Sequence, residues 1–187
     1  MPRRNLKSTD LRPTQGIVQK SLLDILRPRL AEASFLDLFA GTGKIGFLAL
    51  EGGARKAVLV ENAPRQIKLL QDTAAKADWG EKAQIVPLRV ESALERLKGP
   101  FDLIFIDPPY SLSQGIPTLS AILRRGLLAP GGWAVVEHHL KDRLPETLET
   151  LVKFRSKIFG QTVLSFYRED SDEAIGNQGK NNLEDNL

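Results

Sequence analysis

The sequence contains no cysteine and only two histidines among 187 residues. Without cysteine there is no disulfide, no thiolate nucleophile and no cysteine-ligated zinc site. The two imidazoles, His138 and His139, are adjacent and would point to opposite faces of a strand, so we expect no metal site. No run of about eighteen apolar residues could span a bilayer, and residues 1–16 offer no apolar stretch for a secretory signal. We therefore expect a cytoplasmic protein that contacts no membrane.

The net charge of +3 is distributed unevenly along the chain. Residues 169–187 hold six acidic side chains against Lys180, a balance of −5, so residues 1–168 carry +8. We predict a basic arm over 1–13, one domain over 14–168 and an acidic, disordered tail over 169–187. The basic side chains of the arm suit contact with phosphates; they are Arg3, Arg4, Lys7 and Arg12. A solvated basic face that binds nothing would have the same composition.

Short apolar runs alternate with helical patterns along most of the chain. Strands that alternate with helices of this length specify a parallel sheet with right-handed crossovers. The last two predicted strands are instead joined by Gly160-Gln161, which predicts an antiparallel hairpin at the edge of the sheet. We therefore predict a single α/β domain. Its expected strands cover 34–39, 56–61, 83–90, 101–106, 132–139, 153–160 and 162–168, and its expected helices cover 14–30, 44–53, 64–77, 91–97 and 116–127.

A glycine loop, "DLFAGTGKIG", joins the first predicted strand to the next helix. Gly41, Gly43 and Gly46 have the spacing that lets a backbone turn tightly and approach a ligand at a helix N-terminus. Glu61 ends the second strand, where a carboxylate can accept both hydroxyls of a ribose. The loop lacks the first glycine and the Lys-Ser/Thr ending of a triphosphate-binding loop. A nicotinamide or flavin cofactor and S-adenosylmethionine both remain possible on this spacing.

Asp37, in the strand before the loop, favours S-adenosylmethionine. Its negative charge would repel a pyrophosphate, but it could hold the cationic amino-acid end of S-adenosylmethionine, directly or through water. The alternative is a buried strand acid that is satisfied by amides of the loop itself.

A second motif, "FIDPPY", ends the strand predicted over 101–106. Consecutive prolines cannot continue the hydrogen-bond ladder, so the strand ends at Asp107 and the prolines fix Tyr110 beside it. An acceptor and a ring in a fixed relation suit a flat, amine-bearing ligand, although a rigid turn alone would use the same residues. The first and fourth strands of a doubly wound sheet end at one crevice, so this motif and the glycine loop are expected to face one ligand.

Together, "FLDLFAGTGKIG", "VLVEN" and "FIDPPY" resemble the class I S-adenosylmethionine-dependent methyltransferases that modify exocyclic amines of nucleobases. The segments "LRPTQGIVQKSLLDIL", "VVEHH" and "RSKIFGQTVLSFYR" extend the resemblance, over about 11–168, to the RsmD family of 16S ribosomal RNA guanine-N2 methyltransferases. The resemblance implies a Rossmann-like fold with a seven-stranded, mostly parallel sheet. It also implies the cofactor S-adenosyl-L-methionine and a partner that is 16S RNA or an assembling small subunit. Nothing in the sequence requires more than a monomer.

The resemblance also implies roles for particular residues. The cofactor loop would comprise Asp37, Phe39, Ala40, Gly41 and Gly43, with Glu61 on the ribose and Asn62 against the adenine. Family members commonly place an acid or amide on the adenine amine where this chain has Glu91 followed by Ser92, so either could make that contact. The catalytic loop would comprise Asp107, Pro108, Pro109 and Tyr110, and the RNA contacts would come from Arg3, Arg4, Lys7 and Arg12.

The chemistry of the catalytic loop fits more than one base. Asp107 and the Pro108 carbonyl could accept both N–H groups of a guanine 2-amino group, with Tyr110 stacked on the base. The same acceptors suit N6 of adenine, so a DNA or RNA adenine methyltransferase is an alternative, as is a noncatalytic RNA-binding module that retains the fold. An NAD-dependent oxidoreductase fits least. Glu137, at the end of the fifth strand, is a candidate second polar group near the site.

Overall fold

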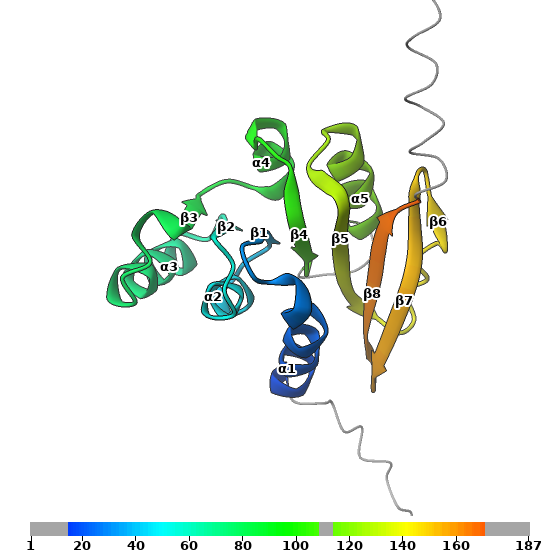
Figure 1. Ribbon diagram of the computed structural model, residues 1–187, viewed down its shortest axis with the longest axis horizontal. Coiled ribbons are helices and arrows are strands. Elements are labelled where there is room, and N and C mark those ends of the chain that lie inside the picture. Colours follow the sequence, from blue (N-terminus) through cyan, green and yellow to red (C-terminus); the bar gives the residue numbers. More distant parts are fainter. Residues whose placement is uncertain (1–14, 109–113, 171–187) are drawn as a thin grey trace, which may run out of the picture.

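The computed structural model describes residues 15–108 and 114–170, which form one sheet with helices on both faces. The strand order is β3-β2-β1-β4-β5-β8-β7-β6, and Figure 1 shows it from left to right. The predicted arm over 1–13 lies outside the described residues, as does the predicted tail from residue 171 onward. The predicted start of the tail at residue 169 was wrong, because Glu169 ends the strand β8 (Thr162–Glu169) and the amide of Asp170 donates to the Thr150 carbonyl at 2.9 Å. Within the described part of the chain, no helix is long and apolar enough to cross a membrane.

Five strands run parallel and form the core of the sheet: β1 (Ser34–Leu38), β2 (Lys56–Val60), β3 (Ala83–Val86), β4 (Phe101–Ile106) and β5 (Leu128–His139). This confirms the predicted α/β class. β3 stops before Pro87, four residues short of the predicted end, because proline cannot donate to the ladder. β1 pairs with both β2 and β4, so the loops that follow β1 and β4 leave the sheet side by side, as predicted.

The antiparallel end of the sheet is larger than predicted. β7 (Leu151–Phe159) and β8 (Thr162–Glu169) form the expected hairpin, and β8 pairs with β5. A two-residue strand, β6 (Thr147–Leu148), adds to the outer edge of β7, so the sheet has eight strands rather than seven. Two residues are too few to show the alternation of apolar and polar side chains by which a strand is recognised in a sequence.

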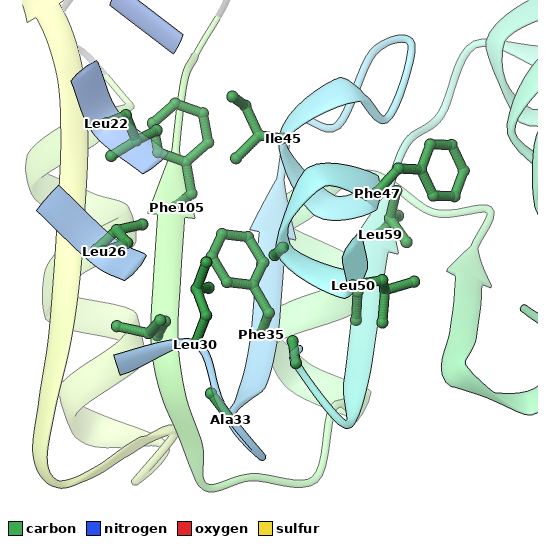
Figure 2. Close-up of a cluster of buried hydrophobic side chains, with 14 of the residues drawn as sticks. Leu22, Leu26, Leu30, Ala33, Phe35, Ile45, Phe47, Leu50, Leu59 and Phe105 are labelled. Atoms are coloured by element: carbon green, nitrogen blue, oxygen red, sulfur yellow. The ribbon is translucent and has the colours of Figure 1, made fainter. Parts of the chain in front are cut away.

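The helices cover the sheet in two layers. One face packs against α1 (Gln15–Leu26), α2 (Lys44–Glu51) and α3 (Pro64–Lys76), and the other packs against α4 (Val90–Arg96) and α5 (Gly115–Arg124). Short 3-10 turns follow α1 (η1, Arg27–Arg29) and α3 (η2, Gly80–Lys82). Figure 2 shows Leu22 and Leu26 of α1 directed at Phe35 and Phe105 on the first face. The central strands are therefore buried on both sides, as parallel sheets require.

Successive residues of each strand alternate between these two layers. In β1, Phe35 belongs to the core beneath α1, and its neighbour Leu36 belongs to the core beneath α4 and α5. In β4, Phe105 and Ile106 divide in the same way. This alternation fixes which face of the sheet each side chain at a strand end occupies.

Two glycines of the loop after β1 offer a matched test of packing. Gly43, at φ 77°, precedes α2; an added Cβ would collide with the Leu70 side chain and lie 2.7 Å from Phe47 and 2.9 Å from Leu59. Gly41 is also left-handed, at φ 54°, but a Cβ there would come no closer than 4.0 Å to the Phe39 carbonyl oxygen. We expect Gly43→Ala to lower the free energy of unfolding by about 2–4 kcal/mol, and Gly41→Ala by about 1–2 kcal/mol.

Denaturant unfolding of the two variants and the wild type measures these losses. Equal losses would show that the side chains around Gly43 give way and that only backbone strain matters.

Candidate functional site

A cleft of about 890 Å³ opens where the parallel strands end. Its walls come from the loop after β1, the residues that follow β2, the start of α4 and the end of β4. A smaller cavity of about 220 Å³ lies on the β5 side and is lined in part by the residues that join β7 to β8. The two spaces share Asp107, Pro108 and Glu137. These three residues therefore stand between a large and a small ligand space.

The loop after β1 is held by backbone hydrogen bonds. The amide of Ala40 donates to the Val60 carbonyl at 2.9 Å, and that of Gly43 donates to the Ala40 carbonyl at 2.7 Å. Phe39 and Gly41, both at positive φ, line the large cleft. Gly43 instead faces the side chains beneath α2 and α3. The first two residues can therefore touch a ligand, whereas Ala40 and Gly43 shape the loop.

Glu61 joins this loop to the start of α3. Its carboxylate accepts hydrogen bonds from the amides of Gly41 at 2.8 Å, Asn62 at 2.7 Å and Ala63 at 2.8 Å. Glu61 and Asn62 both line the cleft. A carboxylate has about four acceptor positions, so Glu61 keeps capacity for a ligand hydroxyl beside the amides it already holds.

Asp37 lies behind the loop. It is 2% exposed, and its Oδ2 accepts a hydrogen bond from the amide of Gly46 at 3.0 Å. Burial raises the pKa of Asp37 to about 7, and the charges of Asp107 and Glu61 add to the rise, while the Gly46 bond opposes it. The contact with Gly46 is the one that a buried strand acid would make. A role toward a cofactor would therefore act through its charge from beneath the loop.

The start of α4 distinguishes the two candidates for the adenine contact. Glu91 lies in the first turn of α4 and lines the cleft, whereas Ser92 is not part of that lining. The apolar side chains of Val60 and Leu88 line the same region. The cleft lining thus combines apolar residues with the carboxylate of Glu91, and apolar pockets with a few polar groups are typical of small-molecule sites.

Asp107 and Glu137 are the titratable groups at the junction of the two spaces. Asp107 is exposed, yet the protein around it displaces enough water that desolvation raises its pKa to about 6. Burial, with a smaller contribution from the charge of Asp107, raises the pKa of Glu137 to about 7. Carboxyl groups with pKa values near neutrality in a cleft are typical of functional sites. The predicted partners Pro109 and Tyr110 lie outside the described residues, and so do Arg3, Arg4, Lys7 and Arg12.

The two histidines line the smaller cavity but have separate hydrogen bonds. His138 Nε2 lies 2.9 Å from the Ser165 hydroxyl, and its Nδ1 lies 3.0 Å from the carbonyl of His139. His139 Nε2 lies 3.1 Å from Gln161 Oε1, while its Nδ1 accepts from the amide of Lys141. Among residues 15–108 and 114–170, no three metal-ligating side chains cluster together. Sequence reasoning did not find Gln161 at the site, because its hairpin is distant along the chain.

Comparison with known proteins places this geometry in a family. The family model described as "Conserved hypothetical protein 95" matches residues 3–168. A relative from Haemophilus influenzae named "Ribosomal RNA small subunit methyltransferase D" is 30% identical, over 87% of this chain and 86% of its own length. A solved structure of a conserved hypothetical protein from Streptococcus pyogenes is 28% identical, with a TM-score of 0.76 over 81% of this chain and 95% of the other.

The fold itself is shared more widely. An RNA methyltransferase from Salinibacter ruber, solved in complex with S-adenosyl-L-homocysteine, has a TM-score of 0.62 at 18% identity, over 82% of this chain and 91% of its own. At that identity the likeness shows a class I methyltransferase fold. The family match covers the whole of the predicted domain over 14–168 and confirms the resemblance on which the residue roles were predicted. The chain belongs to the Conserved hypothetical protein 95 family, the RsmD family of methyltransferases.

Proposed function

We propose that the protein transfers the methyl group of S-adenosyl-L-methionine to the exocyclic N2 amine of a guanine in 16S ribosomal RNA. The observation that carries the proposal is the position of Asp107 and Pro108 at the junction of the two ligand spaces. Hydrogen-bond acceptors there can meet an amine from one space and a methyl donor from the other. The named activity of the family relative supports the substrate class.

The large cleft fits the cofactor. Glu61 would accept a ribose hydroxyl, and Asn62 and Glu91 would meet the adenine, while Phe39 and Gly41 pack beside it. Asp37 would attract the cationic amino group from beneath the loop. When bound, the cofactor supplies a sulfonium that already activates its methyl group.

The residues at the junction would prepare the nucleophile. The lone pair of a guanine 2-amino group is delocalised into the ring, and it becomes available as the nitrogen pyramidalises. Asp107 and the Pro108 carbonyl would accept its two N–H groups and hold the nitrogen in line with the methyl group. As the N–CH₃ bond forms and the S–CH₃ bond breaks, Asp107 can accept the proton that the nitrogen loses. A pKa of about 6 lets Asp107 do so and return the proton to water.

The proposal also covers the RNA contacts, the cellular location and the oligomeric state of the protein. The basic arm, with Arg3, Arg4, Lys7 and Arg12, would hold phosphates beside the methyltransferase domain predicted over 14–168, and the acidic tail would follow the end of β8 at Glu169. The protein would act in the cytoplasm, as a monomer, on 16S RNA or on an assembling small subunit.

Removal of the Asp107 carboxylate tests the proposed role. Asp107→Ala should lower kcat by about 10²–10⁴-fold, because it removes both an orienting acceptor and the proton acceptor. Its dissociation constant for S-adenosylhomocysteine should stay within about threefold of the wild type. The assay measures transfer of labelled methyl from S-adenosylmethionine to unmodified small subunits, naked 16S RNA and duplex DNA, followed by nucleoside analysis.

Asp102, at the other end of β4, provides the matched control. Its carboxylate accepts from the amide and hydroxyl of Ser34 at 2.8 and 2.7 Å, so Asp102→Ala should destabilise the fold but leave kcat unchanged at a temperature where the variant is folded. Label recovered as N2-methylguanosine supports the proposal. Label in adenine would keep the mechanism and overturn the base. Cofactor binding without any transfer would favour a noncatalytic RNA-binding module.

Two neighbouring residues of α4 separate the possible adenine contacts. We expect Glu91→Ala to weaken S-adenosylhomocysteine binding by about 5- to 50-fold, because an acceptor on the cleft wall is lost. Ser92→Ala should leave the dissociation constant within about twofold of the wild type. Isothermal titration calorimetry of both variants measures the difference, and the reverse order of effects would assign the contact to Ser92.

The pH dependence of methyl transfer follows from the raised pKa values at the junction. Asp107 accepts hydrogen bonds and a proton only when it is ionised, so activity should be lost as the pH falls through its pKa. We expect kcat/KM to rise with pH along an acid limb whose apparent pKa lies between 6 and 7, because Glu137 titrates beside Asp107. A profile that stays flat down to pH 5, with cofactor binding intact, would contradict this role.

A further inference from the structure

The register of β4 and β5 sets two carboxylates side by side. Ile106, the last residue of β4, pairs with Val136 of β5; Asp107 directly follows β4, and Glu137 is the next residue of β5. Ile106 and Val136 both pack in the core beneath α5, whereas the residues before them, Phe105 and Val135, pack beneath α1. By alternation, Asp107 and Glu137 return to the α1 face together. Both then line the large cleft and the small cavity.

Neither carboxylate is neutralised by the protein around it. Within residues 15–108 and 114–170, neither Asp107 nor Glu137 accepts a hydrogen bond or forms an ion pair, whereas Glu61 and Asp37 are both bonded to backbone amides. A desolvated carboxylate without a partner is costly to hold in a fold. Two such groups beside one cavity therefore indicate a ligand that presents several adjacent hydrogen-bond donors.

The nucleobases differ in what lies beside their exocyclic amines. Guanine places the N1–H donor next to its 2-amino group, so N1 and the 2-amino group together present adjacent donors, with the O6 acceptor beyond them. Adenine places the acceptor N1 next to its 6-amino group, and cytosine places the acceptor N3 next to its 4-amino group. A second carboxylate beside Asp107 would attract the donor of guanine and repel the lone pair of the other two bases.

We propose that Glu137 selects the target base, its carboxylate accepting the N1–H of guanine while Asp107 accepts from the 2-amino group. This inference rests on the proposed function. Glu137 would supply the base specificity that the Asp-Pro-Pro-Tyr motif lacks, because acceptors for an exocyclic amine alone fit all three bases. Glu137 contacts the base and contributes to specificity; the methyl transfer itself remains with Asp107 and Pro108.

Gln161, which also lines the small cavity, offers hydrogen-bond donors that match guanine. His139 Nδ1 accepts from the amide of Lys141, so Nε2 carries the proton and donates to Gln161 Oε1. Among the residues that the structure describes, the amide nitrogen of Gln161 donates to no partner, so its two N–H donors are available. Because Gln161 lines the small cavity, these donors are complementary to O6 of a guanine whose N1–H meets Glu137.

The test measures kcat/KM for methyl transfer to two RNAs that differ in the base at one position, the nucleotide that the wild-type protein methylates. One substrate is small-subunit RNA with guanine there, and the other carries 2-aminopurine, which keeps the 2-amino group but has an unprotonated N1. Both RNAs are assembled with small-subunit proteins. Wild type should prefer guanine by about 10- to 100-fold in kcat/KM. In Glu137→Gln the preference should fall by at least about fivefold, because the amide can accept from N1–H or donate to a bare N1. Any preference that remains comes from O6, which 2-aminopurine also lacks and which Gln161 would contact.

Two further variants keep the test specific. Glu137→Asp retains the acceptor and should retain the preference for guanine. Asp142→Asn removes another acid beside the small cavity and should leave the ratio unchanged, because the proposal gives Asp142 no contact with the base. Thermal unfolding and S-adenosylhomocysteine binding verify that each variant is folded and binds cofactor.

Other outcomes would overturn the inference. A folded Glu137→Gln with the wild-type ratio would show that Glu137 does not select the base, and an equal change in Asp142→Asn would show a general charge effect. Complete loss of transfer to both RNAs, with cofactor still bound, would make Glu137 part of the chemistry instead. If wild-type protein methylates no guanine, the proposed function fails, an outcome distinct from all of these.

Discussion

The desolvation of three carboxyl groups at one edge of the sheet is the constraint on which the site depends. Asp37, Asp107 and Glu137 follow one another across β1, β4 and β5, and desolvation raises the pKa of each to about 6 or 7. A raised pKa means that the folded protein binds a proton more tightly than the unfolded chain. Each group therefore lowers the free energy of unfolding as the pH rises from about 4 toward its raised pKa. A fold that carries this cost at neutral pH has acids placed for a ligand rather than for stability.

Glu61, at the same edge of the sheet, holds the cofactor loop in place. Its three amide partners come from the loop after β1 and from the start of α3, so one side chain fixes two segments that are distant in the sequence. Gly43 fixes the other side of that loop by packing against the side chains beneath α2 and α3. The surface offered to a cofactor is therefore set before the cofactor arrives, which lowers the ordering cost of binding.

The local sequence pattern was sufficient to predict the α/β class, the hairpin and the crevice between β1 and β4. These features depend on the alternation of strands with helices, on turn residues and on where strands end. The pattern was insufficient where distant segments decide the outcome. β6 is too short to show a period, and the burial of Gly43 depends on Leu70 of α3. Asp37 lies behind the loop, where it accepts a hydrogen bond from Gly46. The sequence could not distinguish this position from one in which the same strand acid contacts a ligand directly. Glu137 could be recognised as polar at a strand end, but its position beside Asp107 depends on the register of β4 and β5, whose last pair is Ile106 and Val136.

That pairing suggests how one fold can serve several target bases. The acceptors proposed after β4 would recognise an exocyclic amine, a group that guanine, adenine and cytosine all carry, so their chemistry would be common to all three. The residue beside them comes from β5, a separate strand, and can change without moving the acceptors or the cofactor loop. A carboxylate there favours the N1–H of guanine, whereas a donor at the same position would favour the ring nitrogen of adenine or cytosine. Reaction and base selection would then reside on adjacent strands, joined only by the hydrogen bonds of the sheet.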